Sequence, residues 1–247
     1  MQDFLTHRRK LIPYIAKKTK AKSYLEIGVR GGKTFYPVKV RKKIAVDPEF
    51  RIKDDYKRSQ SFRYWPNFFA KLFECTSDDF YKNHAKNVIA AGSLDLAFID
   101  GLHTAEQTYI DVVNTMPYMA DNGIIIVHDV SPKSAAAAYP ATSIDEVKKI
   151  KPKGFNGMWS GDVWKIMPKL RSEFSHYDMF VIDHDSGIGL ICKQPLFKNQ
   201  DKYKNTIDYD NEIINAWSYE DLDANRKDLL NLHSDEDILA DCWLFNN

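Results

Sequence analysis

The sequence predicts an α/β, Rossmann-like fold: a mostly parallel sheet with helices on both faces and an antiparallel hairpin strand at its C-terminal end. Residues 22–48 contain an apolar strand, a glycine turn, a presumptive helix and a second strand that ends in Asp47. Residues 94–100 and 124–129 are continuous apolar runs, typical of strands buried on both faces of a parallel sheet. Two more strand-like runs, 176–183 and 187–193, are joined by a link too short for a parallel crossover, which predicts a hairpin.

Local patterns predict the remaining elements. An N-terminal helix over residues 3–18 would turn Phe4, Leu11, Ile12 and Ile15 inward and bend at Pro13. The other expected elements are strands at 23–28 and 43–47, an irregular, lid-like stretch over 51–71, a strand ending near Thr76, a helix capped by Ser77 and Asp78, a helix beginning at Thr104, a turn at 121–123, and helices after Ser218 and Ser234.

Length and charge predict one elaborated domain with appendages. The chain has 247 residues, of which 44% are hydrophobic, enough for one substantial core. We expect a helical segment at 1–21, a cofactor-binding domain at 22–195, and an acidic helical tail at 196–247 that packs on the domain or on a partner subunit. The last 47 residues carry 12 acidic and 4 basic side chains, which leaves a net charge of +9 on residues 1–200.

The cysteines and the apolar pattern predict a cytoplasmic protein without a membrane span. Cys75, Cys192 and Cys242 are odd in number and widely spaced, which favours buried thiols over a disulfide framework. No run of 18 apolar residues is present in the sequence, and the N-terminus lacks the apolar core of a signal peptide. Nucleic acid is disfavoured as a partner because no binding motif accompanies the basic residues, while homo-oligomers stay open.

The glycine turn distinguishes between three kinds of nucleotide site. The run from Gly28 to Gly32 does not fit the G-x-G-x-x-G pattern of dinucleotide-binding folds, and Ile27 stands where a P-loop requires its first glycine. The segment does fit E-x-G-x-x-x-G, with Thr34 two residues further on. We expect Gly28, Gly31 and Gly32 to adopt positive φ and Asp47 to accept ribose hydroxyls. The turn resembles motif I of class I S-adenosylmethionine (SAM) methyltransferases.

A longer resemblance covers residues 22–193. The runs FIDGLHTAEQTYIDV, GIIIVHDVSP, WSGDVWK and FVIDHDSGIGLI resemble the class I methyltransferases that include macrolide-sugar (macrocin) and aminocoumarin O-methyltransferases. This resemblance implies seven strands, SAM as the cofactor, and methyl transfer to a hydroxyl of a sugar, glycan or related polar small molecule. The cofactor-binding residues that it implies are Glu26, Gly28, Gly32, Thr34, Asp47, Ser77, Asp78 and Asp100.

The resemblance also suggests how a weakly nucleophilic hydroxyl would be activated. His103 could act as a general base, or Asp100 and Asp129 could bind Mg²⁺ or another divalent cation. Metal-dependent relatives carry a second Asp or Asn after the later carboxylate, whereas this chain has Val130. The sequence therefore leaves metal dependence open, with His103 as a ligand, a base or a structural residue. The catalytic residues expected are His103, Asp100 and Asp129.

Two residues are expected near the acceptor, and two other functions stay open. Trp159 and Asp185 lie on segments that the family fold would bring to the pocket mouth, where aromatic faces pack well against sugars. One alternative is a metal-independent methyltransferase of another acceptor atom. The other is a non-catalytic domain that binds SAM or a nucleotide, in which a triphosphate would require Lys33.

Overall fold

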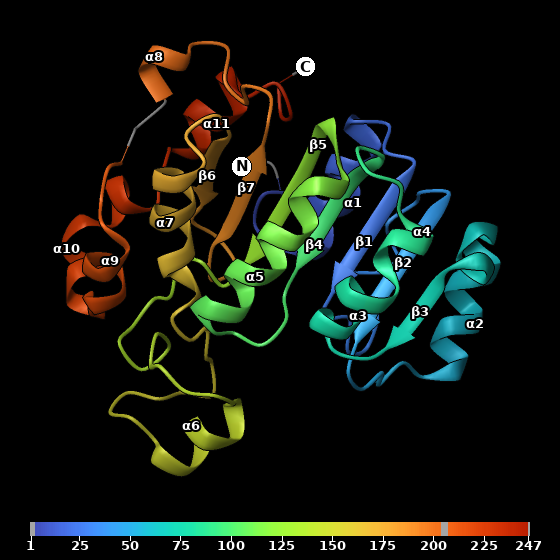
Figure 1. Cartoon of the computed structure of the whole chain (residues 1–247), viewed down its shortest axis with the longest axis horizontal. Helices are drawn as coiled ribbons and strands as arrows, with labels where there is room; N and C mark the ends of the chain where they lie inside the picture. Colours follow the sequence, from blue (N-terminus) through green and yellow to red (C-terminus); the bar gives the residue numbers. More distant parts are fainter. Residues whose placement is uncertain (1–2, 204–206, 247) are drawn as a thin grey trace. The chain divides into compact units, whose positions relative to one another are not determined.

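The computed structural model describes residues 3–203 and 207–246, in which seven strands form one mixed sheet in the order β3-β2-β1-β4-β5-β7-β6 (Figure 1). The strands are β1 (Ser23–Ile27), β2 (Lys42–Asp47), β3 (Lys71–Glu74), β4 (Leu94–Ile99), β5 (Met119–His128), β6 (Asp178–Ile182) and β7 (Ile188–Cys192). The prediction of a Rossmann-like sheet with a terminal antiparallel hairpin is confirmed.

Helices cover both faces of this sheet. The α-helices are α1 (Arg8–Lys18), α2 (Asp54–Arg63), α3 (Ser77–Asn83), α4 (Ala85–Val88), α5 (Ala105–Thr115), α6 (Ile144–Ile150), α7 (Ile166–Glu173), α8 (Gln200–Tyr203), α9 (Asn211–Ala216), α10 (Tyr219–Leu229) and α11 (Asp235–Asp241). Three 3₁₀ turns are η1 (Trp65–Phe69), η2 (Met116–Tyr118) and η3 (Val163–Lys165). By its contacts the chain divides into two units, Met1–Gly101 with Asp111–Ile126, and Leu102–Ile110 with Val127–Asn247.

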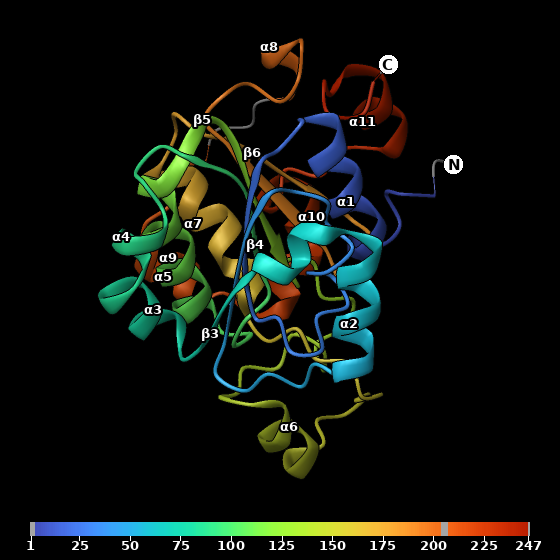
Figure 2. The ribbon, with the colours of Figure 1, turned by 90° about the vertical axis from the view of Figure 1, so that its right-hand side faces the viewer.

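In the first unit, β1 pairs in parallel with β2 and β4, and β2 pairs with β3. All five residues of β1 are buried, as expected for a strand with neighbours on both sides. Figure 2 shows α3 and α4 on one side of these strands and α1 and α2 on the other. The N-terminal helix buries Leu11, Ile12 and Ile15 as predicted, while Phe4 precedes it and stacks on Tyr14 at 3.9 Å between ring centroids.

The connection between β1 and β2 differs from the predicted helix. Every residue from 28 to 41 is described, and the segment forms turns. The Lys43 side chain explains this path, because its Nζ donates hydrogen bonds to the carbonyl oxygens of Phe35 (2.6 Å) and Tyr36 (3.3 Å). These carbonyls accept from a buried amine, so they are not used in a helical ladder. Lys43 is 2% exposed, although it stands in a run of basic residues from 41 to 43.

Three further expectations in this unit are wrong. The stretch 51–71, expected to be irregular, forms α2 and η1. The N-cap of α3 is Thr76, whose hydroxyl accepts from the Asp79 amide at 3.2 Å, so Ser77 and Asp78 are its first helical residues. The predicted turn at 121–123 lies inside β5. A side chain at Gly123 would come within 2.7 Å of the Leu94 carbonyl, so close backbone contact, not chain reversal, explains that glycine.

In the second unit, β6 and β7 form the predicted hairpin, which leaves no room for a crossover. Figure 1 shows α7 in front of this pair. The C-terminal helices begin as predicted, with Ser218 capping α10 through a capping box and Ser234 capping α11. Their segment packs on the hairpin, since Asn231 donates to the Met179 carbonyl at 2.8 Å. Among the described residues, no helix has the length and apolar character needed to cross a membrane.

Candidate active site

The glycine turn after β1 takes a backbone path that other residues cannot follow. Gly28 has φ +85°, and a Cβ at this position would lie 1.9 Å from the carbonyl oxygen of Asp100. Gly32 has φ +70°. Gly31 is not in the positive-φ region; instead its neighbour Arg30 (φ 46°) adopts the positive φ that was expected of Gly31. Two of the three glycine predictions are therefore correct, and the turn brings its bare backbone directly against the end of β4.

Asp47 fastens this turn to the end of β2. Its carboxylate accepts the backbone N–H of Arg30 at 2.6 Å and of Glu49 at 2.8 Å, and the residue is 7% exposed. Each oxygen keeps a second lone pair, so the carboxylate has acceptor capacity for a further donor. The predicted contact with a ribose stays a prediction, while a role in holding the loop is shown by these two bonds.

Glu26 lies in the interior at the base of the turn. It is 1% exposed, and Tyr24 donates its hydroxyl hydrogen to the Glu26 carboxyl at 2.6 Å. Burial raises the pKa of Glu26 to about 8, and burial lowers the pKa of Lys43 to about 7. Desolvation disfavours the charged form of both groups. Burial therefore disfavours charge on both groups in the interior below the glycine turn.

Glu26→Gln is expected to stabilise the protein more and more as the pH rises from about 5 to 8. In the unfolded chain this carboxyl has an ordinary pKa of 4.5, whereas the folded value is about 8. Between these values the unfolded state has lost a proton that the folded state keeps, so wild-type stability falls with rising pH. Glutamine does not ionise and can still accept from Tyr24.

Urea unfolding at a series of pH values checks this. The variant should gain about 1–3 kcal/mol over wild type at pH 8 and nothing near pH 4. The exposed Glu220→Gln serves as the control. A difference independent of pH would show that Glu26 keeps its ordinary ionisation.

The other predicted cofactor residues occupy three places in the first unit. Asp100 follows β4, donates its amide hydrogen to the Ile27 carbonyl at 2.9 Å, and pairs with Arg8 of α1 at 3.5 Å. Thr34 is buried in the loop after Gly32. Ser77 and Asp78 form the first turn of α3. The pairing of Arg8 with Asp100 gives α1 a place at the carboxyl end of the strands that the sequence did not reveal.

In the second unit, His103 and Asp129 come together. The His103 Nε2 atom lies 3.3 Å from Asp129 Oδ2, and its Nδ1 atom lies 3.0 Å from the carbonyl oxygen of Trp159. The Trp159 ring stacks on the imidazole at 5.4 Å between centroids. Because a carbonyl oxygen can only accept, the ring hydrogen belongs on Nδ1. This leaves Nε2, the nitrogen beside the carboxylate, for proton transfer or for a cation.

Further polar groups extend this pair into a chain. The Ser160 hydroxyl donates to Asp129 Oδ1 at 2.7 Å, and His128 Nδ1 lies 3.0 Å from Asp129 Oδ2. The other nitrogen of His128 lies 3.6 Å from Asp185 Oδ2. His128 is buried, and it joins two acids that the sequence left separate. Sequence reasoning missed Ser160 and this role of His128, although Ser160 stands in the quoted WSGDVWK run.

Backbone strain coincides with this cluster. His103 (φ 51°), Asp129 (φ 63°) and Asp185 (φ 50°) all adopt left-handed backbone conformations, which residues other than glycine rarely take. Such conformations persist where the surroundings fix them, and they concentrate at functional sites. Gly161 (φ +64°) shows how tight the packing is, because a Cβ there would lie 1.9 Å from the His103 carbonyl oxygen. The fold therefore holds the three polar residues in place at a cost in local strain.

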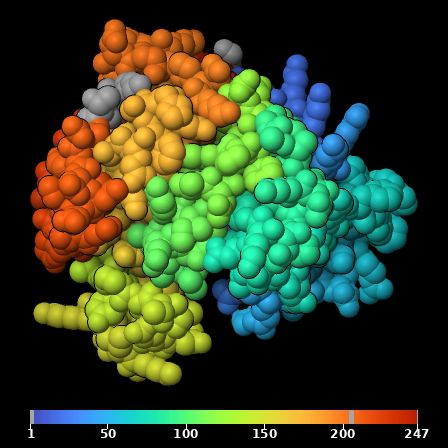
Figure 3. All heavy atoms as spheres, in the orientation of Figure 1, coloured from blue at the N-terminus to red at the C-terminus, as the bar shows by residue number. Residues whose placement is uncertain are grey.

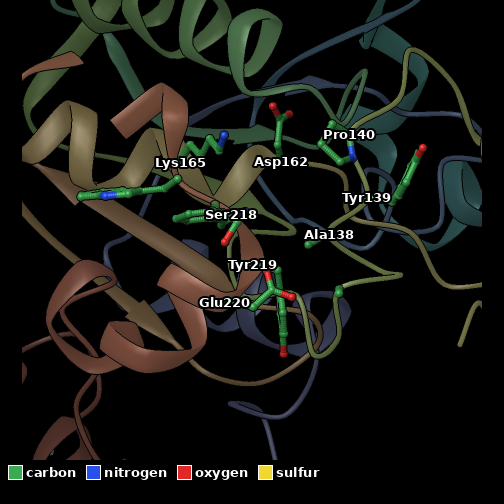
Figure 4. A pocket seen from close by; sticks show the side chains of 11 residues that line it. Ala138, Tyr139, Pro140, Asp162, Lys165, Ser218, Tyr219 and Glu220 are labelled. Atoms are coloured by element: carbon green, nitrogen blue, oxygen red, sulfur yellow. The ribbon is translucent and has the colours of Figure 1, made fainter. Parts of the chain in front are cut away.

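A cavity of about 230 Å³ lies in the same unit (Figure 4). Its wall combines aromatic rings, carboxylates and a lysine, and the residues are Ala135, Ala138, Tyr139, Pro140, Asp162, Trp164, Lys165, Trp217, Ser218, Tyr219 and Glu220. Asp162 also accepts the Ala105 amide at 2.7 Å, and Trp159 donates its indole hydrogen to the Tyr139 carbonyl at 2.8 Å. Two cavity residues thus bond directly to the segments that carry His103 and its stacking partner.

Comparisons with known proteins agree with this architecture. Residues 25–130 match the model of a methyltransferase domain family. No curated protein matches the sequence. The fold is similar to the SAM complex of TomG, an O-methyltransferase from Streptomyces achromogenes (12% identity, 78% of this chain and 82% of that one, TM-score 0.52).

Two other solved structures are similar to a comparable degree. One is the methyltransferase PaMTH1 of Podospora anserina with bound S-adenosylhomocysteine (SAH), at 17% identity, covering 76% of this chain and 78% of that one, with a TM-score of 0.50. The other is cofactor-bound Rv0187 from MTB, at 14% identity, 76% and 80% coverage, and a TM-score of 0.50. The chain thus has the Rossmann-like fold of these solved methyltransferases, and residues 25–130 match a methyltransferase domain family.

Proposed function

We propose that this protein is a SAM-dependent O-methyltransferase that acts on a hydroxyl of a saccharide or related polar small molecule. The observation that carries the proposal is the His103–Asp129 pair, which is held by strained backbone in the same unit as a cavity with aromatic and acidic walls. The relative TomG, an O-methyltransferase with bound SAM, supports the choice of donor and of an oxygen acceptor.

The proposal assigns the donor to the glycine turn of the first unit. Gly28 and Gly32 leave the backbone uncovered, so an adenosyl ligand can approach it without meeting a Cβ. Asp47, fixed by two amides, would offer its remaining lone pairs to the ribose. We assign Glu26, Thr34, Ser77, Asp78 and Asp100 to the surroundings of the cofactor, as the resemblance implies. Three free cysteines support a reducing, cytoplasmic location.

The chemical step requires a proton acceptor. The hydroxyl oxygen attacks the methyl carbon in line with its bond to sulfur, that bond breaks, and SAH leaves as a neutral thioether. The hydroxyl proton passes to Nε2 of His103, because Nδ1 keeps its own hydrogen on the Trp159 carbonyl. Asp129, 3.3 Å from Nε2, then stabilises the imidazolium.

The cavity supports a polyhydroxylated acceptor. Tyr139 and Tyr219 line the cavity, and aromatic rings pack well on the C–H surface of a sugar, while Asp162 and Glu220 can accept hydrogen bonds from its hydroxyls (Figure 4). Trp164 is 1% exposed and supports the wall by stacking on Trp217, as expected for a core residue. Trp159 contributes through its stacking on His103, and Asp185 would position His128.

The residues of this unit also fit a divalent cation. His103 Nε2 faces a carboxylate while Nδ1 is bonded to a backbone carbonyl, which is the usual outer partner of a metal-binding histidine. His103 and Asp129 would then hold the ion, and Nε2 of His103 would be a ligand and not the proton acceptor. A bound ion would lower the pKa of the acceptor hydroxyl. An imidazole among the ligands suits Mn²⁺ or Zn²⁺ better than Mg²⁺.

Incubation with methyl-labelled SAM and a panel of saccharides, phenols and amines tests the proposal. We expect label in the saccharides. The same assay with and without a chelator determines whether the reaction requires a metal. Glu220→Ala should raise the KM for the saccharide at least threefold and leave SAH affinity unchanged, with Glu236→Ala as the control. Transfer only to nitrogen acceptors, or SAH binding with no transfer to any acceptor, would refute it in favour of the two other functions.

A further inference from the structure

An exposed aromatic cluster on the first unit is unlike the rest of its surface. Four rings lie within eight residues of the chain: Phe62 is 77% exposed, Trp65 65%, Phe68 43% and Phe69 68%. They contact one another, with centroids 5.5 Å apart for Phe62 and Phe68 and 4.9 Å apart for Trp65 and Phe68. A contiguous group of exposed rings marks an interaction surface, whereas single exposed apolar residues do not.

The fold holds these rings outward. Asn67, in the middle of η1, is 2% exposed, and its side-chain amide donates to the carbonyls of Gln60 (3.0 Å) and Tyr36 (3.2 Å). Its oxygen accepts from the buried Lys43 at 2.8 Å. In a 3₁₀ turn residues three apart share a face, so Trp65 and Phe68 project together. The polar residue of this turn is inside and the rings are outside, which is the reverse of an ordinary surface turn.

The charged residues within the stretch that carries the cluster have one sign. From Tyr56 to Phe73 the chain has four basic residues, Lys57, Arg58, Arg63 and Lys71, and no acidic residue. All four are exposed. The acids that flank this stretch are Asp54 and Asp55, which begin α2 about 10–12 Å along the helix axis from Phe62 at 1.5 Å per residue, and Glu74, which ends β3. Figure 3 shows this part of the chain, in light blue to turquoise, at the molecular surface.

We propose that this aromatic–basic surface, formed by α2 and η1, docks the protein on an anionic lipid bilayer. Tryptophan and phenylalanine insert at the level of the headgroups, and flanking lysine and arginine side chains reach the lipid phosphates. Charge complementarity favours this occupant, because an anionic surface attracts the four exposed cations of this stretch. The docking is peripheral and involves no spanning helix. It does not depend on the proposed reaction.

Co-sedimentation with vesicles tests the inference, using phosphatidylcholine alone and an equal mixture with phosphatidylglycerol. Wild type should bind the mixed vesicles at least tenfold more tightly, and high salt should weaken this binding. Trp65→Ser with Phe69→Ser should lower the partition coefficient at least tenfold. Lys57→Ser with Arg58→Ser should lower it about tenfold on the mixed vesicles only.

Matched variants on the second unit provide the controls. Met158→Ser with Ile213→Ser removes two large apolar side chains that are 58% and 51% exposed. Lys148→Ser with Lys149→Ser removes two exposed cations. Both double variants should bind vesicles like wild type. Thermal unfolding and SAH titration confirm that each variant is folded. Failure of the wild-type protein to bind anionic vesicles would overturn the inference. It would also be overturned if the wild type formed a dimer that Trp65→Ser with Phe69→Ser dissociates, with no vesicle binding, since a second copy would then cover the surface.

Discussion

Asp129→Asn is expected to lower kcat about a thousandfold while changing SAH affinity less than twofold. The Asp129 carboxylate accepts from Ser160 and lies within 3.3 Å of one nitrogen of each of His103 and His128. An asparagine keeps the shape but cannot stabilise an imidazolium by charge, and its NH₂ group cannot accept a proton. General-base assistance contributes about 10²–10⁴ in rate, and this loss falls within that range.

Single-turnover kinetics with labelled SAM measures the effect, because it isolates the methyl-transfer step from product release. Asp121→Asn is the matched control, since Asp121 is an exposed carboxylate on the same strand, β5. His103→Ala should slow the same step, and combining it with Asp129→Asn should cost little more, because the two residues act as one unit. An Asp129→Asn enzyme with the wild-type rate constant would remove this pair from the mechanism.

The sequence predicted those parts of the fold that local patterns determine. Continuous apolar runs located β4 and β5, the short link at His184 to Ser186 required a hairpin, and capping residues located α10 and α11. The first strand and its glycine turn were equally clear from Gly28 and Gly32. In each case a few neighbouring residues contain the physical reason for the structure.

The failures depend on contacts between distant residues. The β1–β2 connection is not helical because its carbonyl oxygens accept hydrogen bonds from Lys43. The segment of α2 and η1 is ordered because Asn67 donates hydrogen bonds to both Gln60 and Tyr36. The site shows the same division. Asp129 was evident at a strand end, but the chain from Asp185 through His128 joins residues 57 positions apart, which no local pattern reveals.

Gly28→Ala is expected to destabilise the folded protein by at least about 3 kcal/mol and to abolish SAH binding. The native φ of +85° costs an alanine about 1–2 kcal/mol. The new Cβ would also lie 1.9 Å from the Asp100 carbonyl oxygen, which is backbone and belongs to the end of a central strand. Relief would require β1 and β4 to separate at the edge that the cofactor turn occupies, because neither partner is a flexible side chain.

Gly31→Ala in the same turn is the matched control. Gly31 lacks positive φ, and the nearest atom to its added Cβ, the Arg51 carbonyl oxygen, is 3.9 Å away. Alanine at such a position changes stability by less than about 1 kcal/mol, often favourably, because it restricts the unfolded chain. Denaturant unfolding and SAH calorimetry on both variants compare a position with a severe steric contact, Gly28, with one without it three residues later, Gly31. Equal stability of the two variants would mean that the turn after β1 can accommodate a Cβ at Gly28, and that this glycine is not required for its backbone path.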